Sequence, residues 1–294
     1  MTRPIFALLI MLAAGVAALQ AVHERNGGPP AVANADLLYV RSPEALQRLA
    51  LSYDAVLADL YWIRAVQHYG GTKRSTDPDK QYDLLYPLLD LTTSLDPHFN
   101  IAYHFGSIFL AEPPPNGPGR TDLAIRLLEK GLRAQPDKWE FAQAIGFVHY
   151  WWRRDYDSAA EWFARAAKMP AAPVWMAPLA ATTLAQGGRR ESSRRLWEEI
   201  ARTEEAEWFR AEANRRLRQL DAMDQIDRLR QVIAEFVRRD GAVPASWEQL
   251  RQAGLVRGTP LDPSGVPYRL EAGNVVLNTR SPLSPLPTET GQAR

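Results

Sequence analysis

The sequence contains no cysteine among its 294 residues. This absence excludes disulfide frameworks, thiolate metal sites, thiol nucleophiles and a lipoprotein anchor on an acylated cysteine. A net charge of one sign is also absent, because 35 basic side chains oppose 34 acidic ones and leave +1. Proteins dedicated to nucleic-acid binding carry a clear basic excess, since phosphate contacts supply most of their affinity. We therefore expect no nucleic-acid partner.

Patterns that support catalysis or metal binding are missing too. The sequence has no His-x-x-x-His or His-Glu-x-x-His pair, no carboxylates at calcium spacing, no Gly-x-Ser-x-Gly turn and no phosphate-cradling glycine loop. His98 and His104 are the only histidines close in sequence, and six positions on a helix place them on different faces. The sequence predicts no catalytic residue, no cofactor and no metal site.

Charge is concentrated in one stretch, Arg189–Arg218, which interleaves Arg and Glu three and four residues apart. That spacing places opposite charges side by side on a helix. The pattern predicts an exposed, self-paired helical face. Binding of RNA through the arginines is the alternative.

The amino-terminal residues are apolar. The run from Ile5 to Leu19 contains nothing more polar than Gly15 and resumes at Ala21 and Val22. A spanning helix needs about 20 apolar residues and the core of a cleavable signal about 7–15. The small residues that could form a cleavage site, 31–35, lie far from the run, which favours an uncleaved anchor. A cleaved signal and a buried core helix are the alternatives.

The charges around this segment predict its orientation. Arg3 precedes it, whereas Glu24 and Arg25 cancel after it, so the positive-inside rule places the amino terminus in the cytoplasm. Arginine far outnumbers lysine in an alanine-rich chain, which suggests a bacterial source. We predict a single-pass protein of the bacterial cytoplasmic (inner) membrane, crossing through residues 5–22 within an anchor region 1–24. The bulk of the chain would lie on the periplasmic side, after a Gly/Pro/Ala linker at 25–41.

Apolar residues at helical spacing predict a helical region over 42–239. Ser42-Pro43-Glu44 is a helix start, with a capping hydroxyl, a first-turn proline and an acid near the positive end of the dipole. Two helices are expected next, broken near Ser52 and stopped at Gly70-Gly71.

An internal repeat follows. Pro97, Pro136 and Pro170 each close a helical pattern, at separations of 39 and 34 residues, which is the period of helix-turn-helix solenoids. Upstream of each proline, small and large residues recur at matching positions. They are Leu85, Leu89 and Thr92; Ala124, Leu128 and Gly131; Ala159, Phe163 and Ala166; and, without a proline, Ser193, Trp197 and Ile200.

In these positions the chain resembles the second helices of tetratricopeptide repeats, over roughly residues 82–205. First-helix marks are Phe105-Gly106 and Ile145-Gly146. The chain departs from the family in three ways. Ala102 and Ala142 stand where the family has tryptophan, and residues 112–119 form a proline-rich insertion. Pro178 is expected to disturb the first helix of the last repeat. The resemblance implies an all-α, TPR-like solenoid of helical hairpins.

The resemblance also implies a groove lined by first helices, which would bind a partner protein or peptide. Its lining residues are expected to be Asn100, Tyr103, Ser107, Glu140, Gln143, Phe147, Tyr150, Trp175 and Thr182. Gly131 is expected to pack against the neighbouring first helix near Phe105 and Ile145. Leucine at that position should clash and alanine should be tolerated.

The carboxyl-terminal region changes character after Asp240-Gly241. A short helix to Gly254, a turn at Leu261–Gly265 and two β-rich runs around Glu271–Asn274 predict a small α+β module over 240–280. Gly241–Pro244, Gly254 and Asp262–Tyr268 match in order the globular end of the major pseudopilins of type II secretion and of type IV pilins, which the segment resembles. Residues 281–294, rich in Ser, Pro and Thr, are expected to be a disordered tail.

Three functions follow in order of preference. The first is a membrane-tethered, non-enzymatic scaffold that binds a partner in its groove. The second is an accessory structural subunit of a secretion or pilus-like envelope machine, acting through the pilin-like module. The third is an enzyme. The sequence does not name the partner.

Overall fold

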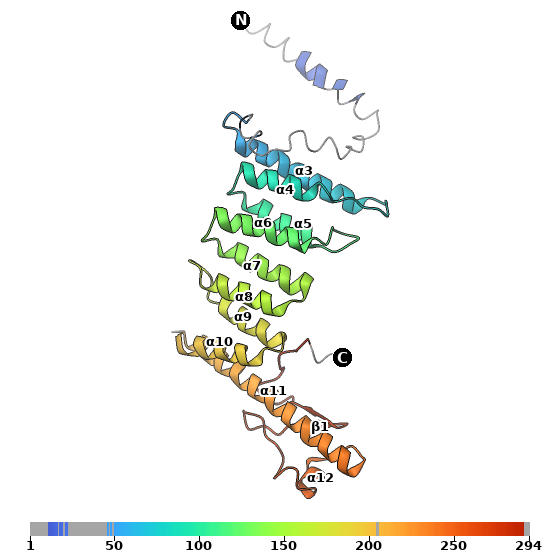
Figure 1. Cartoon of the computed structure of the whole chain (residues 1–294), viewed down its shortest axis with the longest axis vertical. Helices are drawn as coiled ribbons and strands as arrows, with labels where there is room; N and C mark the ends of the chain where they lie inside the picture. The colour runs from blue at the N-terminus through green and yellow to red at the C-terminus, as the bar shows by residue number, and fades with distance from the viewer. Residues whose placement is uncertain are drawn as a thin grey trace. The chain divides into compact units, whose positions relative to one another are not determined.

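The computed structural model is mostly helical (Figure 1). It describes residues 11–16, 18, 19, 21, 22, 46, 48, 50–203 and 206–290. The elements after residue 50 are α3 (Asp54–Arg74), α4 (Leu85–Leu95), α5 (Asn100–Ala111), α6 (Thr121–Ala134), α7 (Trp139–Phe147), the π-helical turn η2 (Val148–Arg153), α8 (Tyr156–Ala167), α9 (Met176–Gln186), α10 (Arg190–Thr203), α11 (Glu207–Asp240), α12 (Trp247–Gln252), β1 (Arg269–Glu271) and β2 (Asn274–Val276).

The predicted membrane segment lies partly outside the described residues. Those of 11–22 that are described are helical and exposed. Among the described residues, no helix has both the length and the apolar character needed to cross a membrane. The predicted linker at 25–41 and the predicted helix start at Ser42 lie outside the described residues.

The chain divides into two compact units, Met1–Asp96 and Pro97–Arg294. In the first unit, α3 packs against α4 and buries the repeat positions Leu85, Leu89 and Thr92. The expected stop at Gly70-Gly71 is wrong, because α3 continues to Arg74. The Arg74 side chain donates to the Gly70 carbonyl at 3.1 Å, a local bond that helps the last turn to outweigh the weak helix propensity of glycine.

The second unit contains three helix pairs, α5/α6, α7–η2/α8 and α9/α10. In each pair the two members pack against each other. All the repeat positions predicted on α6, α8 and α10 are buried. The prolines that follow α6 and α8 lie just outside those helices, as predicted. The expected disturbance at Pro178 is wrong. Since α9 begins at Met176, Pro178 lies in the first turn, where a backbone N–H has no intrahelical acceptor.

Gly131 lies in a close contact between two aromatic rings. A Cβ atom built there would be 2.9 Å from Cε2 of Phe141 and 3.1 Å from Cδ1 of Tyr103, whose ring centroids are 5.1 Å apart. The expectation that Gly131 is closely packed is confirmed. Its expected neighbours, Phe105 and Ile145, are wrong, because the rings of Tyr103 and Phe141 are the groups that meet this face of α6.

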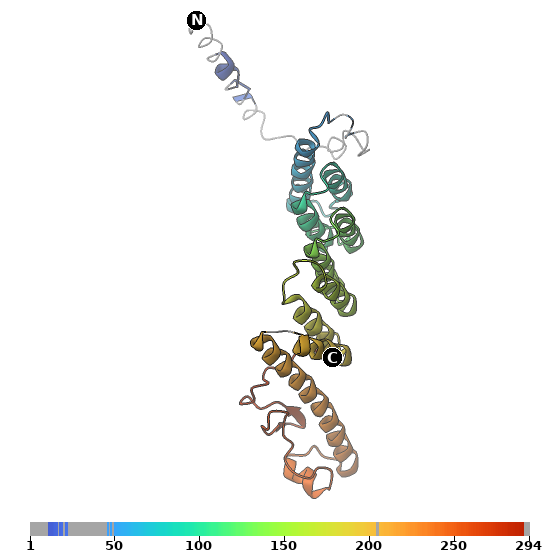
Figure 2. The same cartoon turned by 90° about the vertical axis from the view of Figure 1, so that its left-hand side faces the viewer.

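The carboxyl-terminal module packs along the second half of α11 (Figure 2). Ile233, Leu250, Tyr268 and Val275 share one core, and the Tyr268 hydroxyl donates to Oε1 of Gln225 at 2.8 Å. The predicted hairpin is present but short, with β1 antiparallel to β2. The module therefore shares a core with α11 instead of beginning as a separate domain at residue 240.

The expected disordered tail is wrong for residues 281–290, which form an ordered strap with Leu283 and Glu289 buried. The buried Gln219 side chain donates from Nε2 to the carbonyls of Leu283 and Pro285, each at 2.8 Å. Ser281 donates to the Asp262 carboxylate. The bonds from Gln219 satisfy two backbone carbonyls of a segment that has no regular secondary structure, and the bond from Ser281 joins the segment to the turn at Asp262. Residues 291–294 lie outside the described residues.

Candidate functional site

A cleft of about 300 Å³ lies between α5 and the α7–η2 segment of the second unit. It is the place where two successive first helices come together. Its lining combines aromatic and aliphatic groups with a few polar ones: His104, Ser107, Ile108, Gln143, Ala144, Phe147, Val148, Trp151 and Trp152.

The π-helical turn η2 shapes one wall of this cleft. The helix widens after Phe147 and ends at Arg154, which has a left-handed backbone with φ of 54°. Asp155 then caps α8 by accepting from the Ser158 amide at 3.0 Å. Wide turns of this kind are common at functional sites. Here the turn leaves Trp151 55% exposed beside the cleft.

An exposed apolar stripe runs along α5 and reaches the cleft at Ile108. Ile101, Phe105 and Ile108 are spaced four and three residues apart and are 41% to 53% exposed. On the buried side of the same helix, Ala102 and Tyr103 enter the core. The helix therefore carries apolar residues on two faces, only one of which the fold covers.

Three of the predicted groove residues line the cleft: Ser107, Gln143 and Phe147. Ser107 is buried at its edge, with its hydroxyl donating to the His104 carbonyl at 2.7 Å. The prediction that Tyr103 lines the groove is wrong, because its side chain is fully buried against Phe141. The family pattern placed it in the groove, but Tyr103 and Gly106, three residues apart on α5, both face the core.

The other predicted groove residues are engaged in contacts elsewhere in the second unit. Asn100 accepts a hydrogen bond from Gln135 at 2.8 Å. Glu140 lies 3.6 Å from Lys138, and the exposed Trp175 contacts Trp139 edge to face.

Tyr150 donates from its hydroxyl to Oε1 of Gln186 at 2.8 Å, which joins η2 to the end of α9. Thr182 is half-buried on α9. Neither residue lines the cleft between α5 and η2.

The sequence reasoning missed most of the exposed apolar surface. Ile101, Ile108 and Trp151 were not among the expected groove residues. A signal existed for the first two, since Ile101, Phe105 and Ile108 form a second stripe at helical spacing. No local sequence pattern predicts the π-helical turn η2, which leaves Trp151 exposed.

The cleft is close to uncharged. Desolvation lowers the pKa of His104, although the carboxylate of Glu140 partly opposes that shift. Gln143 contributes a neutral amide. Within the part of the chain that the structure describes, no group of three or more His, Asp or Glu is placed to hold a metal ion. The cleft is therefore suited to binding apolar or aromatic side chains.

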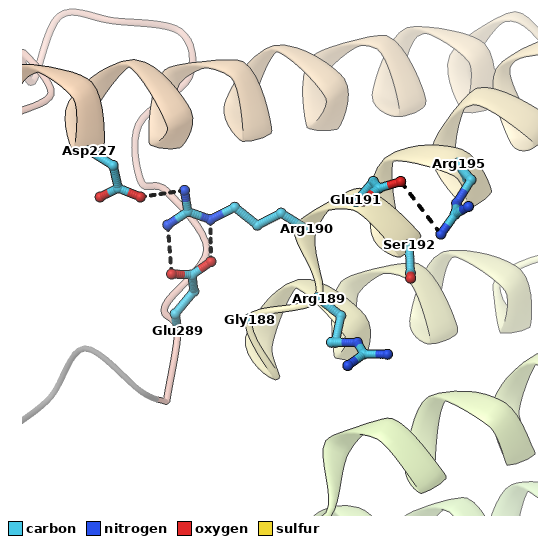
Figure 3. A pocket seen from close by; sticks show the side chains of 8 residues that line it. All are labelled: Gly188, Arg189, Arg190, Glu191, Ser192, Arg195, Asp227 and Glu289. Atoms are coloured by element: carbon cyan, nitrogen blue, oxygen red, sulfur yellow. Dashed lines mark hydrogen bonds and ion pairs between the residues drawn. The ribbon is translucent and has the colours of Figure 1, made fainter.

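A second hollow, of about 630 Å³, lies at the start of α10 and is rich in arginine (Figure 3). Arg190 is held there by carboxylates, donating to Glu289 Oε2 at 2.7 Å and to Asp227 Oδ2 at 2.6 Å. Arg195 lies 3.8 Å from Glu191 within the same helix. Arg190, the central cation of this hollow, is therefore committed to internal ion pairs.

The charged stretch Arg189–Arg218 pairs both within and between helices. Arg216 bonds Glu212 at 2.7 Å along α11, as the interleaved pattern predicted. Arg194 instead reaches from α10 to Asp221 of α11 at 2.5 Å. Long-range pairs of this kind fix the packing of α10 on α11, which the sequence spacing alone did not indicate.

Comparison with models of known protein families, with curated proteins and with solved structures gives no significant match.

Proposed function

We propose that this protein is a membrane-tethered, non-enzymatic scaffold of the bacterial cell envelope. In this proposal a TPR-like helical solenoid binds a partner protein or peptide in the cleft between α5 and α7–η2. The observation that carries the proposal is the exposed apolar stripe of α5, whose Ile108 lines a cleft that also contains an exposed tryptophan, Trp151. Exposed apolar surface beside a concave site is typical of interaction surfaces.

The solenoid interpretation is supported by the repeated burial of matching positions. Leu128 of α6, Phe163 of α8 and Trp197 of α10 are each buried at corresponding places in successive helix pairs. One helix pair cannot bury its apolar face alone, so stacked pairs are the expected solution.

The tether is supported by the apolar run at 5–22, of which the described residues are helical and exposed. An exposed apolar helix is unfavourable in water and favourable in a bilayer. Arg3 and the balanced pair Glu24 and Arg25 support a periplasmic location for the rest of the chain.

The partner that fits best is an amphipathic helix or an extended peptide with apolar anchors. The stripe at Ile101, Phe105 and Ile108 offers contacts along about two helical turns. Tryptophan and phenylalanine provide large contact areas at low entropic cost. The lack of fixed charge in the cleft disfavours a partner recognised mainly through its charge.

The experiment compares two exposed tryptophans in the full-length chain. Trp151→Ala removes a wall of the cleft, whereas Trp208→Ala removes a 65% exposed tryptophan at the start of α11 and serves as the matched control. After cross-linking in the cells that make the protein, we expect one specific partner to be recovered with wild type and with Trp208→Ala and to be lost with Trp151→Ala. Recovery with Trp151→Ala would contradict the proposal.

The accessory-subunit alternative has its own supporting observation. Val243 and Leu261 are large apolar residues exposed on the carboxyl-terminal module. If Val243→Ser and Leu261→Ser together abolish recovery of the partner while Trp151→Ala does not, the module makes the contact. Because the module shares its core with α11, these tests use the whole chain and not a fragment that begins inside that helix.

A further inference from the structure

In the first unit, α3 carries a second apolar stripe that no described residue covers. Tyr53, just before the helix, and Val56, Leu60 and Ile63 on it are 41% to 69% exposed. With the exposed Gln67 they are spaced three, four, three and four residues apart. This is the spacing of the a and d positions of a coiled coil.

The stripe lies nearly opposite the face that packs on α4. Ala58, Tyr61 and Ala65 are buried on that face. At 100° per residue, Leu60 and Ile63 lie well away from them around the helix. The contact with α4 therefore leaves the stripe available for another helix.

The charges beside the stripe match those of a second copy of α3. Asp59 and Arg64 lie on opposite flanks of the stripe, five positions apart, which are the g and e positions of adjoining heptads. In a parallel pair, Asp59 of one copy faces Arg64 of the other. In an antiparallel pair, like charges would face each other. Arg64 lies over the ring of Tyr61 at 5.3 Å from its centroid, so its charge is carried along the flank of the helix.

We propose that two copies of this chain associate through α3, in parallel and in register. Tyr53, Leu60 and Gln67 would occupy the a positions, and Val56 and Ile63 the d positions. A polar residue such as Gln67 at one a position fixes the register. Parallel pairing also places the amino-terminal ends of the two α3 helices on the same side, which is compatible with two chains anchored in one membrane, although the proposal does not depend on that anchor.

The first test measures self-association of the full-length chain in detergent by sedimentation over a hundredfold range of concentration. Ile63→Glu places a charge in the stripe, and Val174→Glu is the control, because Ile63 and Val174 are 51% and 57% exposed and Val174 belongs to neither apolar stripe. We expect wild type and Val174→Glu to dimerise, and Ile63→Glu to raise the dissociation constant at least tenfold with an unchanged helical spectrum. A monomer at every wild-type concentration would overturn the proposal.

The second test determines the relative orientation of the two α3 helices. Because the sequence has no native cysteine, any disulfide must form between introduced cysteines. On mild oxidation, Gln67→Cys should cross-link to itself and Tyr53→Cys to itself. Thr259→Cys, at an exposed position in the second unit, reports non-specific disulfide formation and should remain uncross-linked. In an antiparallel pair an a position faces a d position, so cross-linking only in a mixture of Val56→Cys with Gln67→Cys would show antiparallel pairing and would also overturn the proposal.

The third test uses the charge pattern. Asp59→Arg should weaken association severalfold, and adding Arg64→Asp to it should restore the wild-type dissociation constant. If the double variant is as weak as the single one, the Asp59–Arg64 pairing is wrong. Partner recovery through Trp151 is independent of these outcomes, so the failure of one proposal leaves the other standing.

Discussion

Arg190 and Glu289 are 99 residues apart in the sequence and form a two-pronged ion pair, with Nη2 of the arginine 2.7 Å from Oε2 of the glutamate. The Glu289 side chain is only 7% exposed. Through this pair the carboxyl-terminal strap is attached to the first turn of α10. The hydrogen bonds that Arg190 donates to the carboxylates of Glu289, Asp224 and Asp227 raise its pKa.

Glu289→Ala should lower the free energy of unfolding by about 1–3 kcal/mol, the range for hydrogen bonds to charged groups that are largely buried. Chemical denaturation of the detergent-solubilised chain measures the change. The control is Glu248→Ala, which removes an exposed partner of Arg251 and should leave stability unchanged. Equal effects of the two variants would mean that the ion pair between Arg190 and Glu289 contributes nothing to stability.

Removing the strap should have a larger effect than removing one ion pair. A chain ending at residue 280 loses the buried Leu283 and both acceptors of Gln219. The unfolding free energy should fall by at least about 2 kcal/mol, because apolar burial is lost and a buried amide is left without a partner. A chain ending at residue 290 keeps every contact of the strap and provides the comparison in thermal melts. Identical melts of the two chains would refute the strap's role.

Gly131→Ala should destabilise the protein, contrary to the expectation from the repeat pattern. The added Cβ would lie 2.9 Å from the ring of Phe141, which is buried and has little room to move. The cost should be about 1–3 kcal/mol, and Gly131→Leu should cost more.

Gly71→Ala is the matched control for that change. It also lies within a helix, but its Cβ would meet nothing within 4 Å. It should raise the free energy of unfolding by about 0.5–1 kcal/mol, since alanine is the better helix former. If both alanine variants stabilise the protein, the packing of Gly131 between Tyr103 and Phe141 is wrong.

Stability should fall as the pH drops below about 6.5, the ordinary pKa of histidine. Desolvation lowers the pKa of His68 and, with the Arg153 guanidinium, that of His149 in the folded protein. The folded-state pKa lies below the unfolded one, so the unfolded chain binds more protons in this range, and stability present above pH 6.5 is lost as the pH falls.

Thermal melts between pH 8 and pH 5 measure this dependence. His149→Gln keeps a polar side chain but cannot take up the proton, so its melting temperature should fall less steeply with decreasing pH than that of wild type. A wild-type slope in this variant would show that His149 does not contribute.

The buried side of the helix pairs was readable from the sequence, because small and large residues such as Ala124 and Leu128 recur at positions that must face a neighbouring helix. The exposed side was not. The resemblance to tetratricopeptide repeats placed Tyr103 in the groove, whereas its ring is fully buried between helices, against Gly131 and Phe141. Whether a helical residue is buried depends on which face of the helix it lies on, and residue type alone does not determine that face.

The strap shows a second reason for the difference. Residues 281–290 have the Ser, Pro and Thr content of a disordered segment. Their order comes from Gln219 and Asp262, and none of these contacts is local in sequence. Local propensity has no information about such partners, which also explains why the α10–α11 ion pairs were not expected.

The unbroken helix α11 has a mechanical consequence. At one end Ala213 and Leu220 belong to the core of the last helix pair, and at the other Ile233 and Phe236 belong to the core of the carboxyl-terminal module. Its 34 residues span about 50 Å at 1.5 Å per residue. Because one continuous helix belongs to both cores, we expect the module and the α9/α10 pair to move together and not about a flexible linker.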